Sequence, residues 1–185
     1  MDKVNELETK LKKIKLLALD VDGVLTDGHI NIGAEGELFK AFNAKDGLGI
    51  SASLRNGLQI AIITGRKSSI IHKRADELGI KLLCEGVHDK YAELKRLQRE
   101  LGLDESETAY IGDDLNDLPA FKATGVAFAP ADGCEDVKMC ADFVLEYNGG
   151  SGAVRQAVEM IMKAQNKWGQ IVAGYKQVVS LGDVQ

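Results

Sequence analysis

Short apolar runs alternate with stretches of helical spacing along most of the chain. The apolar runs are continuous, which is typical of strands that are buried on both faces of a sheet. Six strands are predicted, over residues 16–21, 58–63, 81–84, 109–111, 125–128 and 143–145. Helices are predicted between and after them, over residues 48–55, 68–78, 89–101, 115–123 and 153–164. This order predicts an α/β fold with a doubly wound, Rossmann-like parallel sheet.

Three segments depart from this alternation. Residues 28–43 hold two alternating runs around the turn Gly33-Ala-Glu-Gly36, which predicts a β-hairpin inserted after the first strand. Residues 1–15 place Leu7, Leu11 and Ile14 on one helical face, and we expect this helix to pack on the domain. The C-terminal tail, over about residues 165–185, has only weak helical spacing.

Composition limits the classes of protein that the chain can represent. Its 185 residues fit a single domain over residues 1–185 and leave no room for a separate cap domain. The 23 Lys and Arg against 28 Asp and Glu give a net charge of −5, which argues against a nucleic-acid partner. The apolar runs are too short for a membrane span, and no secretory signal is evident. Three cysteines without Cys-x-x-Cys spacing indicate reduced thiols and a cytoplasmic location.

Polar side chains gather directly after the predicted strands. Because the carboxyl ends of parallel strands meet at one edge of a sheet, we expect these side chains to share a crevice. The set is Asp20, Asp22, Thr64, Arg66, Asp113, Asp114, Asn116 and Asp117, joined by Lys90 at the start of a helix. Five carboxylates in one crevice would repel one another unless a cation lies among them, and their oxygens suit Mg²⁺. Carboxylate, metal, hydroxyl and lysine together favour phosphoryl transfer.

Four ordered segments carry a family resemblance. They are Asp20-Val-Asp22-Gly23-Val-Leu-Thr26, Thr64-Gly65-Arg66, Lys90 and Gly112-Asp113-Asp114-Leu-Asn116-Asp117. In order and context they resemble the four motifs of the haloacid dehalogenase phosphohydrolase superfamily, over about residues 15–163. Three further stretches resemble one branch, the 3-deoxy-D-manno-octulosonate 8-phosphate phosphatases: Gly36-Glu37 with Lys40-x-Phe42, Asp46-Gly47-x-Gly49-Ile50, and Gly149-Gly150-x-Gly152-Ala-Val-Arg155.

The resemblance implies a role for each catalytic position. Asp20 would be the nucleophile that forms an aspartyl-phosphate, and Asp22 the general acid and then the base for water. Thr64 would hydrogen-bond the transferring phosphoryl group, and Lys90 would pair with that group and with Asp20. The implied magnesium ligands are Asp20, the main-chain carbonyl of Asp22, Asp113 and, through water or from behind the direct ligands, Asp117.

The resemblance also implies a substrate and an assembly. The substrate would be a phosphorylated 2-keto-3-deoxy sugar acid of lipopolysaccharide biosynthesis. The implied contacts are Asn43, Ala44, Lys45, Asp46, Gly47, Arg66, Arg74 and Asn116. The branch lacks a cap and forms homotetramers, so we expect neighbouring subunits to complete each site. The branch commonly places a basic residue after its Gly-x-Gly-Ile stretch, whereas this chain has Ser51, which leaves a nine-carbon sugar acid phosphate open as the substrate.

Two other classes of function have some support in the sequence. Gly47-Leu-Gly49-Ile-Ser-Ala52 matches a dinucleotide fingerprint, but an alternating segment precedes it instead of a buried strand. A receiver-like phosphoacceptor module also gathers acids, a hydroxyl and a lysine around magnesium. It carries its phosphoacceptor on a middle strand, however, whereas Asp20 follows the first strand and Asp22 stands two residues later. A second acid at that position indicates turnover.

Overall fold

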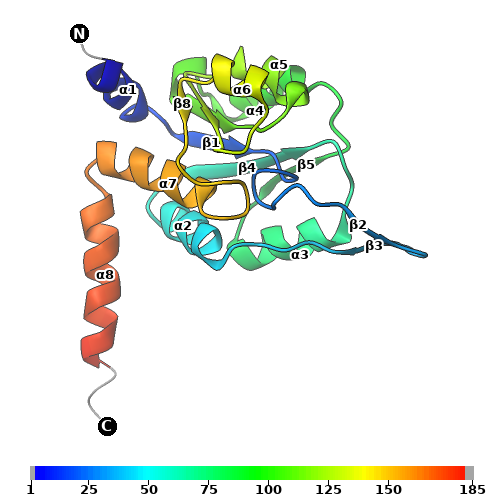
Figure 1. Cartoon of the computed structure of the whole chain (residues 1–185). Helices are drawn as coiled ribbons and strands as arrows, with labels where there is room; N and C mark the ends of the chain where they lie inside the picture. The colour runs from blue at the N-terminus through cyan, green and yellow to red at the C-terminus, as the bar shows by residue number, and fades with distance from the viewer. Residues whose placement is uncertain (1–2, 182–185) are drawn as a thin grey trace.

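A computed structural model describes residues 3–181 of the chain, with side chains over residues 5–177. Its centre is a parallel sheet of six strands in the order β5-β4-β1-β6-β7-β8 (Figure 1). The strands are β1 (Leu16–Leu19), β4 (Gln59–Thr64), β5 (Leu82–Glu85), β6 (Thr108–Ile111), β7 (Val126–Ala129) and β8 (Phe143–Val144). All five pairings are parallel, so the predicted α/β class and doubly wound sheet are confirmed.

Both faces of the sheet are covered by helices (Figure 1). Successive β1 residues point to opposite faces, with Leu17 and Leu19 in one apolar cluster and Leu16 and Ala18 in the other. The first cluster packs against α2 (Ala44–Arg55), α3 (Ser69–Leu78) and α7 (Ala153–Ala164). The second packs against α4 (Lys90–Leu101), α5 (Leu118–Phe121) and α6 (Glu135–Cys140). Burial on both faces explains why the strand interiors are continuous apolar runs, with polar residues only at strand ends such as Gln59, Thr64 and Glu85.

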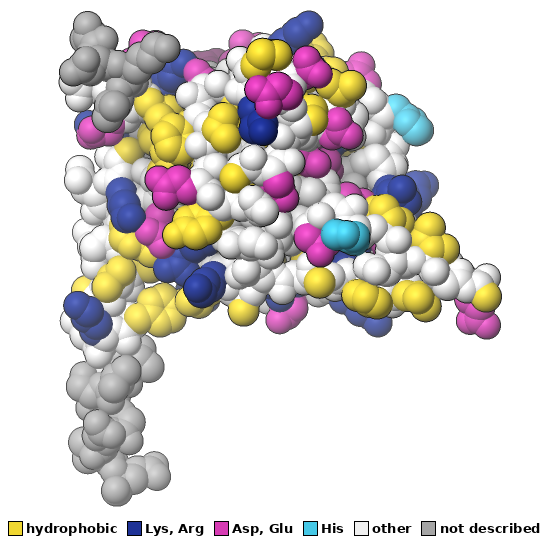
Figure 2. All heavy atoms as spheres, viewed as in Figure 1, with side chains coloured by type: hydrophobic (Ala, Val, Ile, Leu, Met, Phe, Trp, Pro, Cys, Tyr) yellow, Lys and Arg dark blue, Asp and Glu magenta, His cyan; other side chains and the backbone are white. Residues whose placement is uncertain are grey.

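The predicted hairpin lies after β1 as a separate two-stranded antiparallel sheet of β2 (Asn31–Gly33) and β3 (Gly36–Phe39). It projects from the body of the molecule (Figure 1). Apolar side chains stand exposed along the projection (Figure 2), with Ile32 68% and Leu38 63% exposed. Exposed apolar groups on a projecting ribbon are typical of a surface that another chain covers.

Helices occupy the two ends of the described chain. The predicted N-terminal helix is α1 (Lys3–Leu11), which packs on the core through Leu7 and Leu11; Met1 and Asp2 lie outside the described residues. The weakly patterned tail is α8 (Trp168–Leu181), which runs away from the sheet (Figure 1). The predicted tail residues 182–185 lie outside the described part. No helix in residues 3–181 has the length and apolar character needed to cross a bilayer.

Several predicted boundaries are wrong for identifiable reasons. The strand predicted over residues 16–21 ends at Leu19, because the carbonyl of Val21 accepts three N–H groups in a tight turn. The helix predicted from residue 48 begins at Ala44, where the side chain of Asn43 caps it. The helix predicted over 115–123 is divided into a 3₁₀ turn, Leu115–Asp117, and the short α5. The short helix α6 was not predicted; a second 3₁₀ turn, Glu105–Glu107, precedes β6.

Candidate active site

The order of the strands brings the predicted catalytic segments together. β1 lies between β4 and β6, with Leu19 opposite both Ile62 and Ile111. Asp20 therefore follows the central strand, Thr64 ends its neighbour on one side, and Asp113 follows its neighbour on the other. Asp20 is only 6% exposed and Thr64 only 3%. The predicted convergence at the carboxyl edge of the sheet is therefore confirmed for these three positions.

A buried lysine connects two of the carboxylates. Nζ of Lys90, at the start of α4, lies 2.9 Å from Oδ2 of Asp20 and 2.6 Å from Oδ1 of Asp117. The side chain of Lys90 is 1% exposed, so its charge depends on these two partners. Burial lowers the pKa of Lys90, but Asp20 and Asp117 together outweigh burial and raise it. The ammonium is therefore fixed beside Asp20.

Asp117 is a buried acceptor whose two oxygens are both fully engaged. Oδ1 accepts from Lys90 and from the hydroxyl of Tyr110 at 2.8 Å. Oδ2 accepts the main-chain N–H groups of Asp113 at 3.0 Å and Asp114 at 3.3 Å. The side chain has no exposed surface. Asp117 therefore holds the loop after β6 and Lys90 in place, and its geometry suits an indirect contact with a metal.

Asp113 presents an unsatisfied oxygen to the crevice. Its Oδ1 is buried and has no hydrogen-bond partner among the described residues. Gly23, at φ +89°, leaves room for this carboxylate, because a Cβ there would stand 2.0 Å from Oδ2 of Asp113. Oxygens of Asp20, Asp113 and Asp117 lie within 4.8 Å of one another. A buried orphan oxygen in an all-oxygen cluster fits a hard divalent cation such as Mg²⁺.

Burial and the charges of neighbouring carboxylates raise the pKa values of Asp20 and Asp113 in the absence of a cation. Burial and the charge of Asp117 raise the pKa of Asp20 to about 6, although Lys90 opposes the shift. Burial, Asp117 and Asp20 raise the pKa of Asp113 to about 7. A bound cation would favour the charged forms of both groups.

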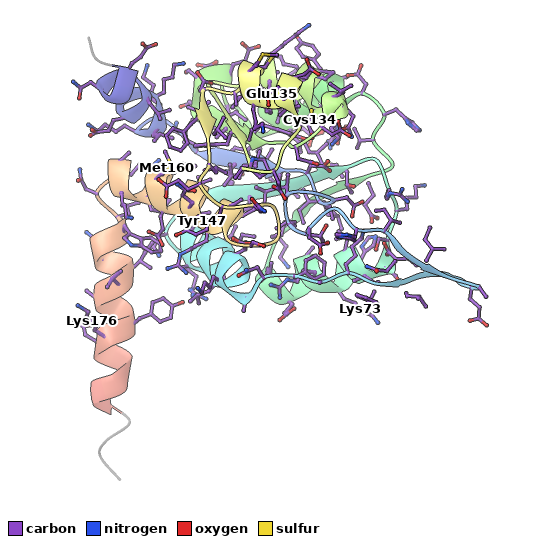
Figure 3. All side chains as sticks on the ribbon, viewed as in Figure 1. Lys73, Cys134, Glu135, Tyr147, Met160 and Lys176 are labelled. Carbon is purple, nitrogen blue, oxygen red and sulfur yellow. The ribbon has the colours of Figure 1, made fainter. Side chains whose placement is uncertain are left out.

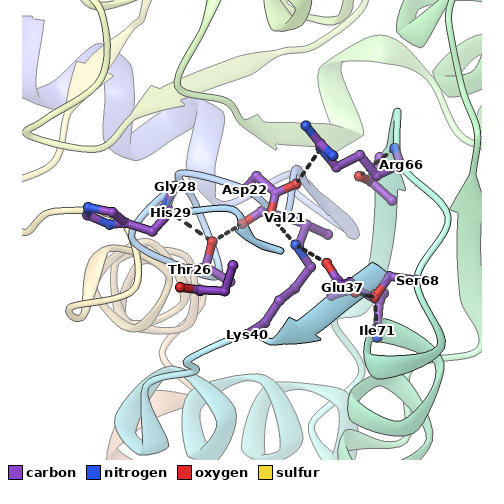
Figure 4. Close-up of polar contacts among 12 residues, drawn as sticks. Val21, Asp22, Thr26, Gly28, His29, Glu37, Lys40, Arg66, Ser68 and Ile71 are labelled. Atoms are coloured by element: carbon purple, nitrogen blue, oxygen red, sulfur yellow. Dashed lines mark hydrogen bonds and ion pairs between the residues drawn. The ribbon is translucent and has the colours of Figure 1, made fainter. Parts of the chain in front are cut away.

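The structure places Asp22 and Arg66 together at the hairpin side of the crevice (Figure 4). Oδ1 of Asp22 forms an ion pair with Lys40, and its Oδ2 lies 3.5 Å from Nε of Arg66. Arg66 is 57% exposed at its side chain, which leaves it free to reach a ligand. The remaining acid, Asp114, is exposed and caps the 3₁₀ turn through the N–H of Leu115 at 2.8 Å. Of the five expected carboxylates, three form the cluster and two do not.

The predicted substrate-binding stretch, residues 43–47, is the start of α2. Asn43 caps this helix through the N–H of Lys45 at 2.8 Å, and its Nδ2 donates to the carbonyl of Gly150 at 3.4 Å. Asp46 is buried, and its carboxylate accepts the N–H groups of Gly152 at 3.2 Å and Arg155 at 2.7 Å. Asp46 thus joins α2 to the start of α7, which suits a role in shaping the pocket better than direct ligand contact.

The remaining predicted contacts surround this helix start. Ala44 and Lys45 are its first residues, and Arg74 of α3 packs beside Gly47, where a Cβ would lie 2.3 Å from a guanidinium nitrogen. Arg74 also lies 5.3 Å above the ring of Phe42. Asn116 is exposed in the loop after β6. The structure thus distributes the predicted contacts between the α2 start, α3 and the β6 loop.

Ser51 stands where the related phosphatases commonly have a basic residue, and its hydroxyl faces α3. Ser51 lies in the middle of α2, and its Oγ donates to the carbonyl of Leu78 at 3.3 Å. Gly47 and Gly49 lie inside the same helix and not in a phosphate-binding loop after a buried strand. This placement removes the structural context that the dinucleotide fingerprint requires.

Gly149 and Gly150 pack closely against the loop that follows Asp20. A Cβ at Gly149 would lie 1.9 Å from the carbonyl oxygen of Gly23, and the N–H of Gly150 donates to the carbonyl of Val24 at 2.9 Å. Only glycine permits so close an approach of two backbones. Tyr110, which borders the site, was missed from the sequence. Glu37 and Lys40 were noted there only as part of a family motif, without a role at the site. The contacts of Lys40 with Asp22 and of Glu37 with Ser68 join residues 18 and 31 positions apart, so no local pattern reveals them.

The chain is similar to several characterised proteins. A profile of haloacid dehalogenase-like hydrolases matches residues 83–158. The 3-deoxy-D-manno-octulosonate 8-phosphate phosphatase KdsC of Haemophilus influenzae is 45% identical over 161 residues, which is 87% of this chain and 89% of that protein. The KdsC protein of Escherichia coli K12 is 42% identical over 158 residues, 85% of this chain and 84% of that protein.

Solved structures agree with the sequence relatives. The phosphatase of that name from Moraxella catarrhalis, in complex with magnesium, phosphate and KDO, has a TM-score of 0.90 and 44% identity, covering 92% of this chain and 98% of the other. The cobalt-bound Haemophilus influenzae enzyme has a TM-score of 0.84 and 46% identity, covering 85% of this chain and 92% of the other.

Fold, motif order and these similarities define the class of protein as a haloacid dehalogenase-like hydrolase. Within that class, the chain belongs to the family of 3-deoxy-D-manno-octulosonate 8-phosphate phosphatases. The family resemblance found in the sequence is therefore confirmed.

Proposed function

We propose that this protein is a Mg²⁺-dependent phosphomonoesterase that converts 3-deoxy-D-manno-octulosonate 8-phosphate to the free sugar acid and phosphate. The strongest support is that Asp20 lies beside the ammonium of Lys90 and close to the carboxylate of Asp113, whose Oδ1 is a buried oxygen without a hydrogen-bond partner among the described residues. The family adds the substrate, because relatives that cover most of this chain are phosphatases for this sugar acid phosphate.

The reaction proceeds through two displacements at phosphorus. An oxygen of Asp20 attacks the phosphoryl group, the bond from phosphorus to the sugar oxygen breaks, and Asp22 gives a proton to that oxygen. Asp22 then takes a proton from water, which attacks phosphorus and releases phosphate from Asp20. Lys90 and Thr64 hold the phosphoryl oxygens during both steps.

Asp20, Asp113 and the main-chain carbonyl of Asp22 would hold Mg²⁺, with Asp117 in an indirect role. When bound, it neutralises charge on the phosphoryl oxygens. Asp117 acts through the contacts that it makes to Lys90 and to the loop after β6. The sugar acid is bound by Arg66, Arg74, Asn116 and the start of α2. The relatives favour the eight-carbon acid over a nine-carbon one.

The proposed activity has a direct test. Purified protein should release phosphate from 3-deoxy-D-manno-octulosonate 8-phosphate in the presence of Mg²⁺, and EDTA should abolish the release until Mg²⁺ is restored. Stable phosphorylation of the protein without phosphate release would instead support the phosphoacceptor alternative.

The stabilisation by Mg²⁺ should depend on pH. The pKa values of Asp20, about 6, and Asp113, about 7, lie above the unfolded value of about 3.9. The metal-free protein therefore loses stability as pH rises from about 4 to 7, because the native state holds protons that the unfolded chain has already released. Mg²⁺ binds the deprotonated carboxylates, so the increase in melting temperature at fixed Mg²⁺ should be larger at pH 8 than at pH 5.5. Equal increases at both pH values, or an undiminished increase in Asp113→Asn, would contradict this assignment.

The proposal extends to assembly and location. A homotetramer is supported by the exposed Ile32 and Leu38 of the hairpin and by the extended α8, which offers Val172 and Tyr175 to another chain. In such an assembly neighbouring subunits cover the crevice, which would exclude bulk water from it. A fully active monomer in sedimentation would refute this arrangement. The three unpaired thiols, Cys84, Cys134 and Cys140, support a cytoplasmic enzyme.

A further inference from the structure

A buried lysine at the base of the hairpin contacts the crevice (Figure 4). Lys40 follows β3, and its side chain is only 2% exposed. Its Nζ forms an ion pair with Oδ1 of Asp22 and a second one, at 3.0 Å, with Oε1 of Glu37. An ammonium this deeply buried depends on anionic partners, because it has given up its hydration. Lys40 therefore joins the hairpin to the aspartate that stands two residues after the nucleophile.

Glu37 connects Lys40 to the start of α3. Its Oε2 accepts a hydrogen bond from Oγ of Ser68, the residue that caps α3 (Figure 4). The N–H of Ser68 donates to Oε1 of Glu85, at the end of β5, over 2.8 Å. On its hairpin side, the ammonium of Lys40 is thus held by Glu37. Glu37 is held by Ser68, which Glu85 at the end of β5 holds in turn.

The two cations beside Asp22 differ in how firmly the fold fixes them. Arg66 is 57% exposed and lies 3.5 Å from Oδ2 of Asp22, whereas Lys40 is buried and bonded on its far side to Glu37. If the carboxylate of a bound sugar acid attracts Arg66, Lys40 remains as the ion-pair partner of Asp22. The orientation of Asp22 during turnover therefore depends on Lys40.

We propose that Lys40 is a positioning residue that holds the Asp22 carboxylate in the orientation required for proton transfer to the leaving sugar oxygen. This inference rests on the proposed role of Asp22 as acid and base. Without the ammonium, Asp22 and Glu37 face each other as like charges, and Asp22 turns away from the leaving group. The residue acts through Asp22 and does not touch the reacting atoms.

The dependence on the leaving group tests this inference. The ratio kcat/KM covers the steps up to departure of the leaving group, and p-nitrophenolate departs without a proton from the enzyme. Lys40→Met should lower kcat/KM for 3-deoxy-D-manno-octulosonate 8-phosphate by about 10- to 100-fold. For p-nitrophenyl phosphate the loss should be less than about 3-fold. An equal loss on both substrates, or no loss on the sugar acid phosphate, would overturn the inference.

The control is the same substitution at an exposed lysine. Lys73 lies on the outer side of α3 and points away from the body of the molecule (Figure 3). Lys73→Met should leave both kcat/KM values unchanged. If Lys40→Met does not fold, Lys40→Gln takes its place, because the amide retains a hydrogen bond without the charge. The same selective loss is expected of it.

A double-mutant cycle separates this inference from the proposed function. In an Asp22→Asn background, Lys40→Met should cause no further loss on the sugar acid phosphate, because its effect passes through Asp22. A further loss of about 10-fold would show an independent structural role and overturn the inference. If Asp22→Asn alone retains the kcat/KM of the parent protein, Asp22 is not the acid and base. This single variant therefore tests the proposed function separately from the role of Lys40.

Discussion

Asp20→Asn should lower phosphate release by about 10⁴-fold or more, because an amide cannot form the acyl-phosphate. The fold should persist, since asparagine has nearly the same shape and can still accept from Lys90. Burial already raises the pKa of Asp20 to about 6, so removal of its charge relieves a cost in the metal-free protein. The melting temperature in EDTA should therefore stay the same or rise. Turnover of the natural substrate and thermal unfolding are the two measurements.

The matched control is Asp76→Asn, an exposed aspartate of α3 that should tolerate the change without loss of activity. Undiminished phosphate release by Asp20→Asn would remove the covalent mechanism. A variant that loses both its activity and its melting transition would show that Asp20 has a structural role, and in that case chemical trapping of phosphate on the parent enzyme would decide whether Asp20 is the nucleophile.

Lys90→Met should damage both stability and catalysis. The substitution leaves Asp20 and Asp117 buried without their shared cation, and removal of one partner from a buried ion pair costs about 3–5 kcal/mol. The loss in the free energy of unfolding, measured with urea in EDTA, should be largest near pH 8 and smaller near pH 5, below the raised pKa of Asp20, where that carboxylate takes up a proton. Turnover should fall by about 10³-fold, since a fixed positive charge beside the phosphoryl group is lost.

Lys95→Met is the control on the same helix. Lys95 forms a partly exposed ion pair with Glu105 at 2.9 Å, and such pairs contribute about 0–1 kcal/mol. If Lys90→Met lowers the free energy of unfolding no more than Lys95→Met does, the stabilising role of the buried Lys90 ion pairs is contradicted. Full activity of Lys90→Met would exclude the lysine from phosphoryl binding.

The sheet and the catalytic edge could be predicted because their signals are local. Each buried strand is a continuous apolar run, and Asp20, Thr64 and Asp113 stand at or directly after strand ends. Parallel pairing then brings those ends together whatever the exact register. Small boundary errors, such as the end of β1 at Leu19, did not alter this outcome.

The remaining features depend on contacts between residues far apart in sequence. Asp46 was predicted as a substrate contact, but it binds the N–H of Arg155, 109 residues later, which no local pattern reveals. The ion pair between Lys40 and Asp22 requires the hairpin to fold back over the crevice. Asp117 illustrates both cases, because its motif was evident, while its bond to the buried ammonium of Lys90, 27 residues earlier, depends on the tertiary fold.

This site should hydrolyse an eight-carbon 2-keto-3-deoxy sugar acid phosphate in preference to other sugar phosphates. The measurement that tests it most directly is kcat/KM of the Mg²⁺-loaded protein on 3-deoxy-D-manno-octulosonate 8-phosphate, beside its nine-carbon counterpart and simple sugar phosphates. The eight-carbon substrate should be preferred by about 10-fold or more over the others, as expected when extra polar contacts are made in the transition state. A preference for the nine-carbon substrate, or equal rates on simple sugar phosphates, would contradict the claim.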